Sequence, residues 1–133
     1  VPDKPRLLAE CARVLGPRGR LVFSDILHRG TLSEEDRQRL FEGMAFSEIA
    51  TVDEYAGHLR SCGMEVVRRI DLAEEWTRIL VERHAMYRAL EAQTVARLGR
   101  EHFERYDRAY EHFVGLYRGG VLAGALIHAR KGG

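Results

Sequence analysis

Several residue types and patterns that mark particular protein classes are scarce in this sequence. It has only 2 cysteines and 3 prolines among 133 residues. No apolar run approaches the roughly 20 residues that cross a bilayer, and no signal peptide is visible. The 21 basic residues nearly equal the 20 acidic ones, so no basic stripe is expected. These absences argue against a disulfide scaffold, a membrane partner and a nucleic-acid binder.

Cysteine and histidine patterns also give no sign of a metal site. Cys11 and Cys62 each fall in a helical pattern, and neither has a partner at metal-ligand spacing. The pattern His-Glu-x-x-His is absent as well. Two reduced core cysteines fit a cytoplasmic location. Because Val1 is not an initiator methionine and the sequence opens just before a helix, we expect the chain to begin inside a domain.

The composition and the patterns of the sequence predict one globular α/β unit. Apolar residues make up 45% and charged residues 31% of the chain, a balance typical of a folded domain. Apolar spacing, capping residues and glycine breaks predict alternating helices and strands. We expect helices at 3–15, 33–46, 52–61, 73–98 and 101–117, and strands at 20–27, 64–72 and 121–129.

Two of these segments carry further detail. The strand at 20–27 is almost continuously apolar, which predicts burial on both faces, as in a parallel sheet. Asp25 is the charged residue near its carboxyl end. The segments 73–98 and 101–117 predict a helical hairpin, with Leu90 and Leu98 on the buried side and an aromatic stripe along the second helix.

Three blocks together resemble class I S-adenosylmethionine (SAM)-dependent methyltransferases. Leu-Leu-Ala-Glu-Cys-Ala-Arg-Val-Leu (7–15), Gly-Pro-Arg-Gly (16–19) and Arg-Leu-Val-Phe-Ser-Asp (20–25) are similar to the helix, turn and fifth strand of that family, although Arg18 replaces a glycine. Residues 54–67 resemble its next helix and sixth strand, and 121–131 its last strand. The branch that it most resembles contains sarcosine/dimethylglycine N-methyltransferases and sugar O-methyltransferases.

This resemblance implies the C-terminal half of the fold. It predicts a partial Rossmann-like sheet of strands five, seven and six, with the last strand of the sequence in the middle. A helical insertion at about 73–118 would complete the single unit at 1–133. The glycine-rich loop that holds the SAM cofactor would lie upstream of Val1, so the chain alone should be inactive. Loss of strand four would leave the strand at 20–27 with an open edge, which predicts a homodimer through that strand or an exchange of elements between chains.

Asp25 and His28 are the candidate catalytic residues. A carboxylate at the end of a parallel strand faces the ligand crevice, where it could orient an acceptor hydroxyl or amine or take its proton. In the sugar O-methyltransferases that the chain resembles, an aspartate here is a proposed partner of a histidine, which this chain lacks. Asp25 could equally cap a turn, and His28 could be a base, a substrate contact or a solvated loop residue.

The candidate substrate-binding residues are one serine and four aromatic residues. Ser24 precedes Asp25, and the aromatic faces could attract a methylated ammonium group by cation–π interaction. The plainer interpretation of these rings is the buried seam of the hairpin. The aromatic candidates are Trp76, Tyr87, Tyr106 and Tyr110.

The sequence therefore favours a methyltransferase that acts on an N or O atom of a small metabolite. The alternative is a non-catalytic helical-hairpin module for dimerisation or ligand binding. Nucleic-acid methylation is disfavoured by the neutral charge and by the absence of an Asn-Pro-Pro-Tyr-like motif.

Overall fold

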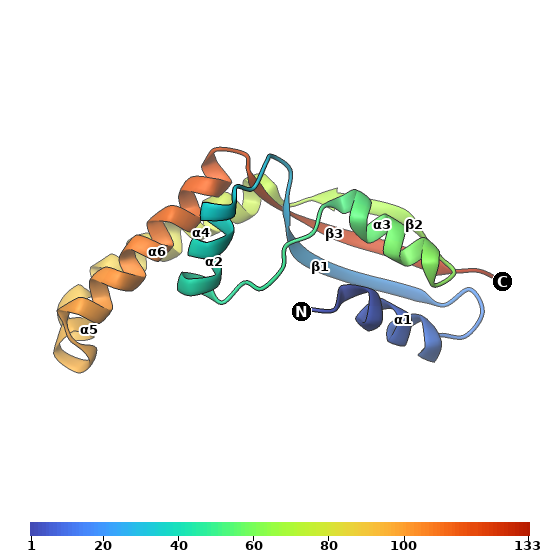
Figure 1. Ribbon diagram of the computed structural model, residues 1–133, viewed down its shortest axis with the longest axis horizontal. Helices are drawn as coiled ribbons and strands as arrows, with labels where there is room; N and C mark the ends of the chain where they lie inside the picture. The colour runs from blue at the N-terminus through green and yellow to red at the C-terminus, as the bar shows by residue number, and fades with distance from the viewer.

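The computed structural model describes all 133 residues, and Figure 1 shows an elongated molecule with a small sheet at one end and a helical arm at the other. The arm is formed by residues 73–118. The strands are β1 (Arg20–His28), β2 (Met64–Asp71) and β3 (Leu122–Lys131). The helices are α1 (Lys4–Val14), α2 (Glu34–Met44), α3 (Val52–Ser61), α4 (Ala73–Ala89), α5 (Glu91–Leu98) and α6 (Arg100–Arg118).

The sheet has the order β1-β3-β2, and β3 runs antiparallel to both neighbours. The last strand of the sequence therefore lies in the middle, as predicted. Asp25 is opposite Ala125 in the β1–β3 register. A bulge between Val66 and Arg68 shifts the β2–β3 register by one residue.

Helices α1 and α3 cover one face of this sheet. Leu8 of α1, Leu59 of α3 and Ile127 of β3 are buried in the same core. Both helices begin at a side-chain cap: the Asp3 carboxylate accepts from the Arg6 amide, and the Thr51 hydroxyl accepts from the Glu54 amide. The caps hold each helix start where its apolar stripe meets the sheet.

On the opposite face of the sheet the first part of β1 is uncovered, which corrects the prediction that β1 is buried on both sides. Side chains alternate along a strand, so Val22 and Ser24 point away from the face that α1 and α3 cover. Val22 is 56% exposed, and Ser24 is exposed too. The continuous apolar run was a misleading signal because nothing in the chain packs over this part of the strand.

The arm departs from the predicted two-helix hairpin at its tip. The predicted helix at 73–98 breaks at Leu90, where the chain turns from α4 into α5. Leu90 and Leu98 are 50% and 60% exposed, so their predicted burial is wrong. The short α5 reverses the chain at the end of the arm, beyond the reach of the seam between α4 and α6. No helix is long and apolar enough to cross a membrane.

A second apolar core joins the arm to the sheet. Leu40 of α2, Phe113 and Tyr117 of α6 and Leu122 of β3 are buried together. The Tyr117 hydroxyl donates to the Ala123 carbonyl at 3.1 Å, which ties α6 to the start of β3.

One glycine sets how closely the arm approaches the sheet. The indole of Trp76, near the start of α4, lies against Gly124 so closely that a Cβ at Gly124 would overlap the ring. Only glycine lacks that atom, so the small residue at this position of β3 is required for the contact.

We therefore expect Gly124→Ala to lower the free energy of unfolding by about 1–3 kcal/mol, the usual cost of overpacking. Urea unfolding followed by the fluorescence of the single tryptophan, Trp76, measures this directly. The matched control is Gly57→Ala in α3, where a Cβ meets no atom within 4 Å; it should be neutral or stabilise by up to about 1 kcal/mol. Equal stability of the Gly124→Ala and wild-type chains would contradict the packing described.

A charged network fastens α4 to α6 further along the arm. The Asp107 carboxylate accepts from His84 Nε2 at 2.7 Å and from Arg88 Nε at 2.8 Å. His84 is buried and stacks on the ring of Tyr110, with centroids 5.3 Å apart. Hydrogen bonds from Arg88 and His84 lower the pKa of Asp107.

A carboxyl group whose pKa is lowered by folding stabilises the fold above its unfolded pKa of about 3.9, and the gain is lost as the pH falls through the folded value. Asp107→Asn should thus cost about 1–2 kcal/mol at pH 7, since it weakens bonds to charged groups. The difference from wild type should shrink below about pH 4. Urea unfolding across this pH range tests it, with Glu48→Gln, an exposed residue outside the helices, as control. A difference that is independent of pH would rule out the ionic origin.

Candidate functional site

Asp25 lies near the carboxyl end of β1, on the face covered by α3. Its Oδ2 accepts a hydrogen bond from the Tyr55 hydroxyl, and its Oδ1 lies 2.8 Å from the amide nitrogen of Ile26. Burial, together with the bond to Asp25, raises the pKa of Tyr55, so this phenol stays protonated and keeps donating. The carboxylate is thus held in one orientation, with lone pairs left for one further donor.

Tyr117, near the end of α6, is the arm residue whose pKa the charge of Asp25 affects. Burial raises the pKa of Tyr117, and the negative charge of Asp25 adds to the effect. Asp25 therefore lies within electrostatic reach of a residue of α6. No local sequence pattern predicts the contact between Tyr55 and Asp25, because the two residues are 30 positions apart.

His28 is not brought together with Asp25. The alternation of side chains along β1 places the two on opposite faces of the strand. His28 is half-buried, and its Nδ1 lies 3.1 Å from the Gly30 carbonyl oxygen, which is a local turn contact. Ser24 also lies on the face opposite Asp25 and is exposed.

The four aromatic candidates fall into two groups. Trp76 lies at the root of the arm, beside the sheet. Tyr87 and Tyr110 are packed further out: the Tyr87 ring stacks on Phe103 at 5.0 Å, and Tyr110 stacks on His84. Tyr106 is exposed, with His102 and Arg105 against its ring. The structure therefore places only Trp76 close to the strand that carries Asp25.

An apolar hollow of about 280 Å³ opens beside Trp76, between α4, α6 and the end of β1. We call it the Trp76 hollow. Its only charged lining residue is Arg83, which has no ion-pair partner. The apolar lining residues are Ile26, Trp76, Ile79, Leu80, Phe113 and Tyr117. Periodicity identified most of them as a seam, but it could not show that the seam leaves a space at its root.

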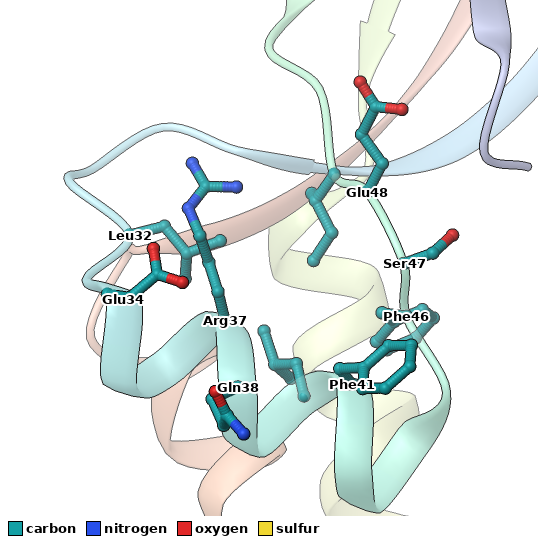
Figure 2. Close-up of a pocket in the computed structure, with 10 residues that line it drawn as sticks. Leu32, Glu34, Arg37, Gln38, Phe41, Phe46, Ser47 and Glu48 are labelled. Carbon is teal, nitrogen blue, oxygen red and sulfur yellow. The ribbon is translucent and has the colours of Figure 1, made fainter.

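A second hollow of about 360 Å³ lies between α2 and the segment that follows it. Figure 2 shows Arg37 extending from α2 on one side and Glu48 on the facing segment. Phe46 lines this hollow, and its ring lies 5.4 Å from that of Phe113, which lines the Trp76 hollow. The two spaces thus flank one aromatic pair.

Two histidines that the sequence analysis did not single out differ in their surroundings: His112 links two helices, and His128 has no partner. His112 Nε2 lies 2.8 Å from Asp36 Oδ1, which joins α6 to α2, and this hydrogen bond lowers the pKa of Asp36. His128 Nε2, on the open face of the sheet, is buried without a hydrogen-bond partner. No group of three or more His, Cys, Asp or Glu side chains is arranged to hold a metal ion, and both cysteines are free.

Sequence comparison relates the chain to methyltransferases. It is 33% identical over 85 residues to the 27-O-demethylrifamycin SV methyltransferase of Amycolatopsis mediterranei, which covers 59% of the chain and 31% of the relative. It is 24% identical over 131 residues to the sarcosine/dimethylglycine N-methyltransferase of Halorhodospira halochloris, covering 98% of the chain and 47% of the relative. No protein-family sequence model matches the chain.

Solved structures show the same relation in the fold. A putative sarcosine dimethylglycine methyltransferase from Galdieria sulphuraria matches 99% of the chain and 48% of its own length, with a TM-score of 0.85 and 21% identity. A cyclopropane synthase from Mycobacterium tuberculosis matches 96% of the chain and 49% of its own length, with a TM-score of 0.84 and 18% identity. The chain therefore has the fold of SAM-dependent methyltransferases and resembles them over about half of their length or less.

Proposed function

We propose that the protein to which this chain contributes transfers a methyl group from SAM to an N or O atom of a small molecule, and that the chain forms the acceptor side of the site. The similarity to both an N- and an O-methyltransferase is the observation that carries this proposal. The fold agrees with it over 99% of the chain.

The chain's own residues do not form a cradle for the cofactor. A nucleotide site of the Rossmann type needs a glycine-rich turn between a strand and a helix. Here β1 leads to α2 through Arg29-Gly30-Thr31-Leu32-Ser33, and β2 leads into α4 through Leu72 alone. Neither turn carries the glycine pattern. We infer that residues outside this chain hold SAM, which supplies the methyl group when bound.

Within the chain, we propose that Asp25 orients the nucleophilic atom of the acceptor and that the Trp76 hollow receives another part of the same molecule. Asp25 and the hollow lie on opposite faces of β1, so the acceptor would have to pass around the carboxyl end of that strand. Tyr117 lines the hollow, and burial raises its pKa, with a smaller contribution from the charge of Asp25. The Trp76 face offers apolar contact and cation–π attraction to an amine. Correct positioning of acceptor and methyl donor would then supply most of the rate.

The remaining candidates would act differently. His28 and Ser24 lie on the face of β1 that also carries Ile26 of the hollow, so they could contact the acceptor from the open side of the sheet. Tyr87 and Tyr110 could reach an acceptor only if the arm opened, since their rings are packed within it. Tyr106 could contact an acceptor only if the tip of the arm folded over the site.

Titration of SAM distinguishes this proposal from the interaction-module alternative. We expect that SAM does not bind to the 133-residue chain. SAM should bind to a longer chain that also contains the residues that the same gene encodes upstream of Val1. The extended chain should form S-adenosylhomocysteine when given small amine or hydroxyl acceptors. Absence of SAM binding by the extended chain would overturn the proposal.

In the same assay, Asp25→Asn should lower kcat by roughly 10- to 100-fold and leave the KM for SAM unchanged, because the amide orients a donor less strongly than the carboxylate does. Asp53→Asn, the same change at an exposed position of α3, is the matched control and should keep the wild-type kcat. An unchanged kcat for Asp25→Asn would remove Asp25 from the site.

We also propose that the 133-residue chain, taken alone in the cytoplasm, pairs through β1 as a homodimer. The His28 amide donates to the Ala50 carbonyl on the side of β1 away from β3. Alternation then leaves the backbone groups of Val22 and Ser24 on the same edge, without a partner strand. Two such edges can pair about a two-fold axis.

Light scattering at micromolar concentration should therefore report a dimer. Val22→Pro should give a monomer, because proline removes an edge N–H that the β1–β3 ladder does not use. Val22→Thr keeps the N–H and should remain dimeric. A monomeric wild-type chain would contradict the pairing.

A further inference from the structure

A groove runs along the outer edge of the sheet, between β2 and α3. It has a volume of about 440 Å³ and is lined by Arg60 of α3 together with Val67, Arg68 and Arg69 of β2. An adjoining hollow of about 650 Å³ shares Arg60 and Val67 with it. We call the two together the basic groove.

The basic groove concentrates one sign of charge in a chain that is nearly neutral. Glu65 is its only acidic lining residue. Its basic lining residues are Arg18, Arg60, Arg68, Arg69, Arg130 and Lys131. Across the whole sequence, by contrast, 21 basic residues face 20 acidic ones. The groove is therefore a local region of positive potential.

Its five arginines are free to bind a ligand. None of them forms an ion pair, whereas Arg78, Arg88 and Arg100 in the arm all do. Lys131 is engaged elsewhere, because its Nζ donates to the Ala12 and Leu15 carbonyls at the end of α1. A guanidinium fork without a carboxylate is suited to bind one from a partner.

The groove also runs along unpaired backbone groups of β2, to which an extended peptide can bind as a further strand. β2 is an edge strand, so the backbone groups on its outer side have no partner strand. Val67, at the bulge of β2, is 50% exposed and gives the groove an apolar contact. An extended peptide laid along such an edge gains main-chain hydrogen bonds, and every second side chain faces the same way.

We propose that the basic groove binds an extended acidic segment of a partner protein, which adds as a fourth strand beside β2. Carboxylates at alternate positions of that segment lie on the face of β2 that carries Arg69 and pair with it and with Arg60 of α3. Arg68 adds positive charge from the other face of β2, and apolar side chains of the segment contact Val67 at the bulge. The plainer role of edge arginines is to keep sheets from pairing edge to edge, and that role provides no affinity for acidic peptides.

Fluorescence anisotropy with a labelled (Glu-Val)₄ peptide and the 133-residue chain tests the proposal. We expect saturable binding at low salt that weakens as salt rises, because screening reduces the charge contacts. The double variant Arg68→Glu/Arg69→Glu should lower the affinity by about tenfold or more. The double variant Arg97→Glu/Arg108→Glu makes the same charge change on the arm and should stay within about twofold of wild type. Circular dichroism confirms that both variants are folded.

Three further probes give the proposal ways to fail. Two modified (Glu-Val)₄ peptides, one N-methylated at every valine and one at every glutamate, keep the charges and each lose one of the two alternating sets of backbone donors. The peptide whose methyl groups face β2 should bind at least about tenfold more weakly than the unmodified peptide. Equal binding of both modified peptides and the unmodified one would overturn strand addition. A (Lys-Val)₄ peptide should not bind. Tighter binding of an eight-nucleotide oligothymidylate than of the acidic peptide would overturn the choice of a protein partner.

Discussion

The pairing of β3 with both β1 and β2 is the constraint on which the rest of the structure depends. β3 comes last in the sequence but occupies the centre of the sheet, so residues 20–28 and 64–71 have no direct strand contact with each other. Both cores are also attached to it: Ile127 belongs to the core under α1 and α3, and Leu122 to the core under the arm. Because its contacts span most of the chain, the sheet cannot close until the last segment docks.

The small residues of β3 explain how one strand serves two cores. Ala125 and Ala129 lie under α1 and α3, and Gly124 lies under Trp76 on the other side. Short side chains let helices approach the sheet closely on both faces. The Trp76 hollow exists at this junction because α4 contacts β3 only at its root and then diverges with α6 along the arm. The geometry that fixes the arm to the sheet also creates the space proposed for the acceptor.

Local patterns in the sequence predicted most elements, whereas contacts between distant residues escaped them. The bounds of α3 and the central place of the last strand are confirmed, since capping residues and the family resemblance specified them. Periodicity could not reveal the break at Leu90, because leucine favours helix and only the reversal at the arm tip overrides it. Nor could it show that Tyr55 holds Asp25 or that Val22 is open to solvent. Each depends on what a distant element does or does not cover.

The net charge of the sequence also failed to predict how charge is distributed over the folded chain. A balance of 21 basic against 20 acidic residues suggested a surface without a preferred partner sign. In the folded chain several carboxylates of the arm form ion pairs with arginines of the same arm. Examples are Asp107, Glu75 and Glu82. The arginines around β2 keep no such partners, so neutral composition coexists with a positive edge. Charge neutrality of a sequence therefore constrains long-range steering more than it constrains local recognition, which depends on where the fold places the unpaired groups.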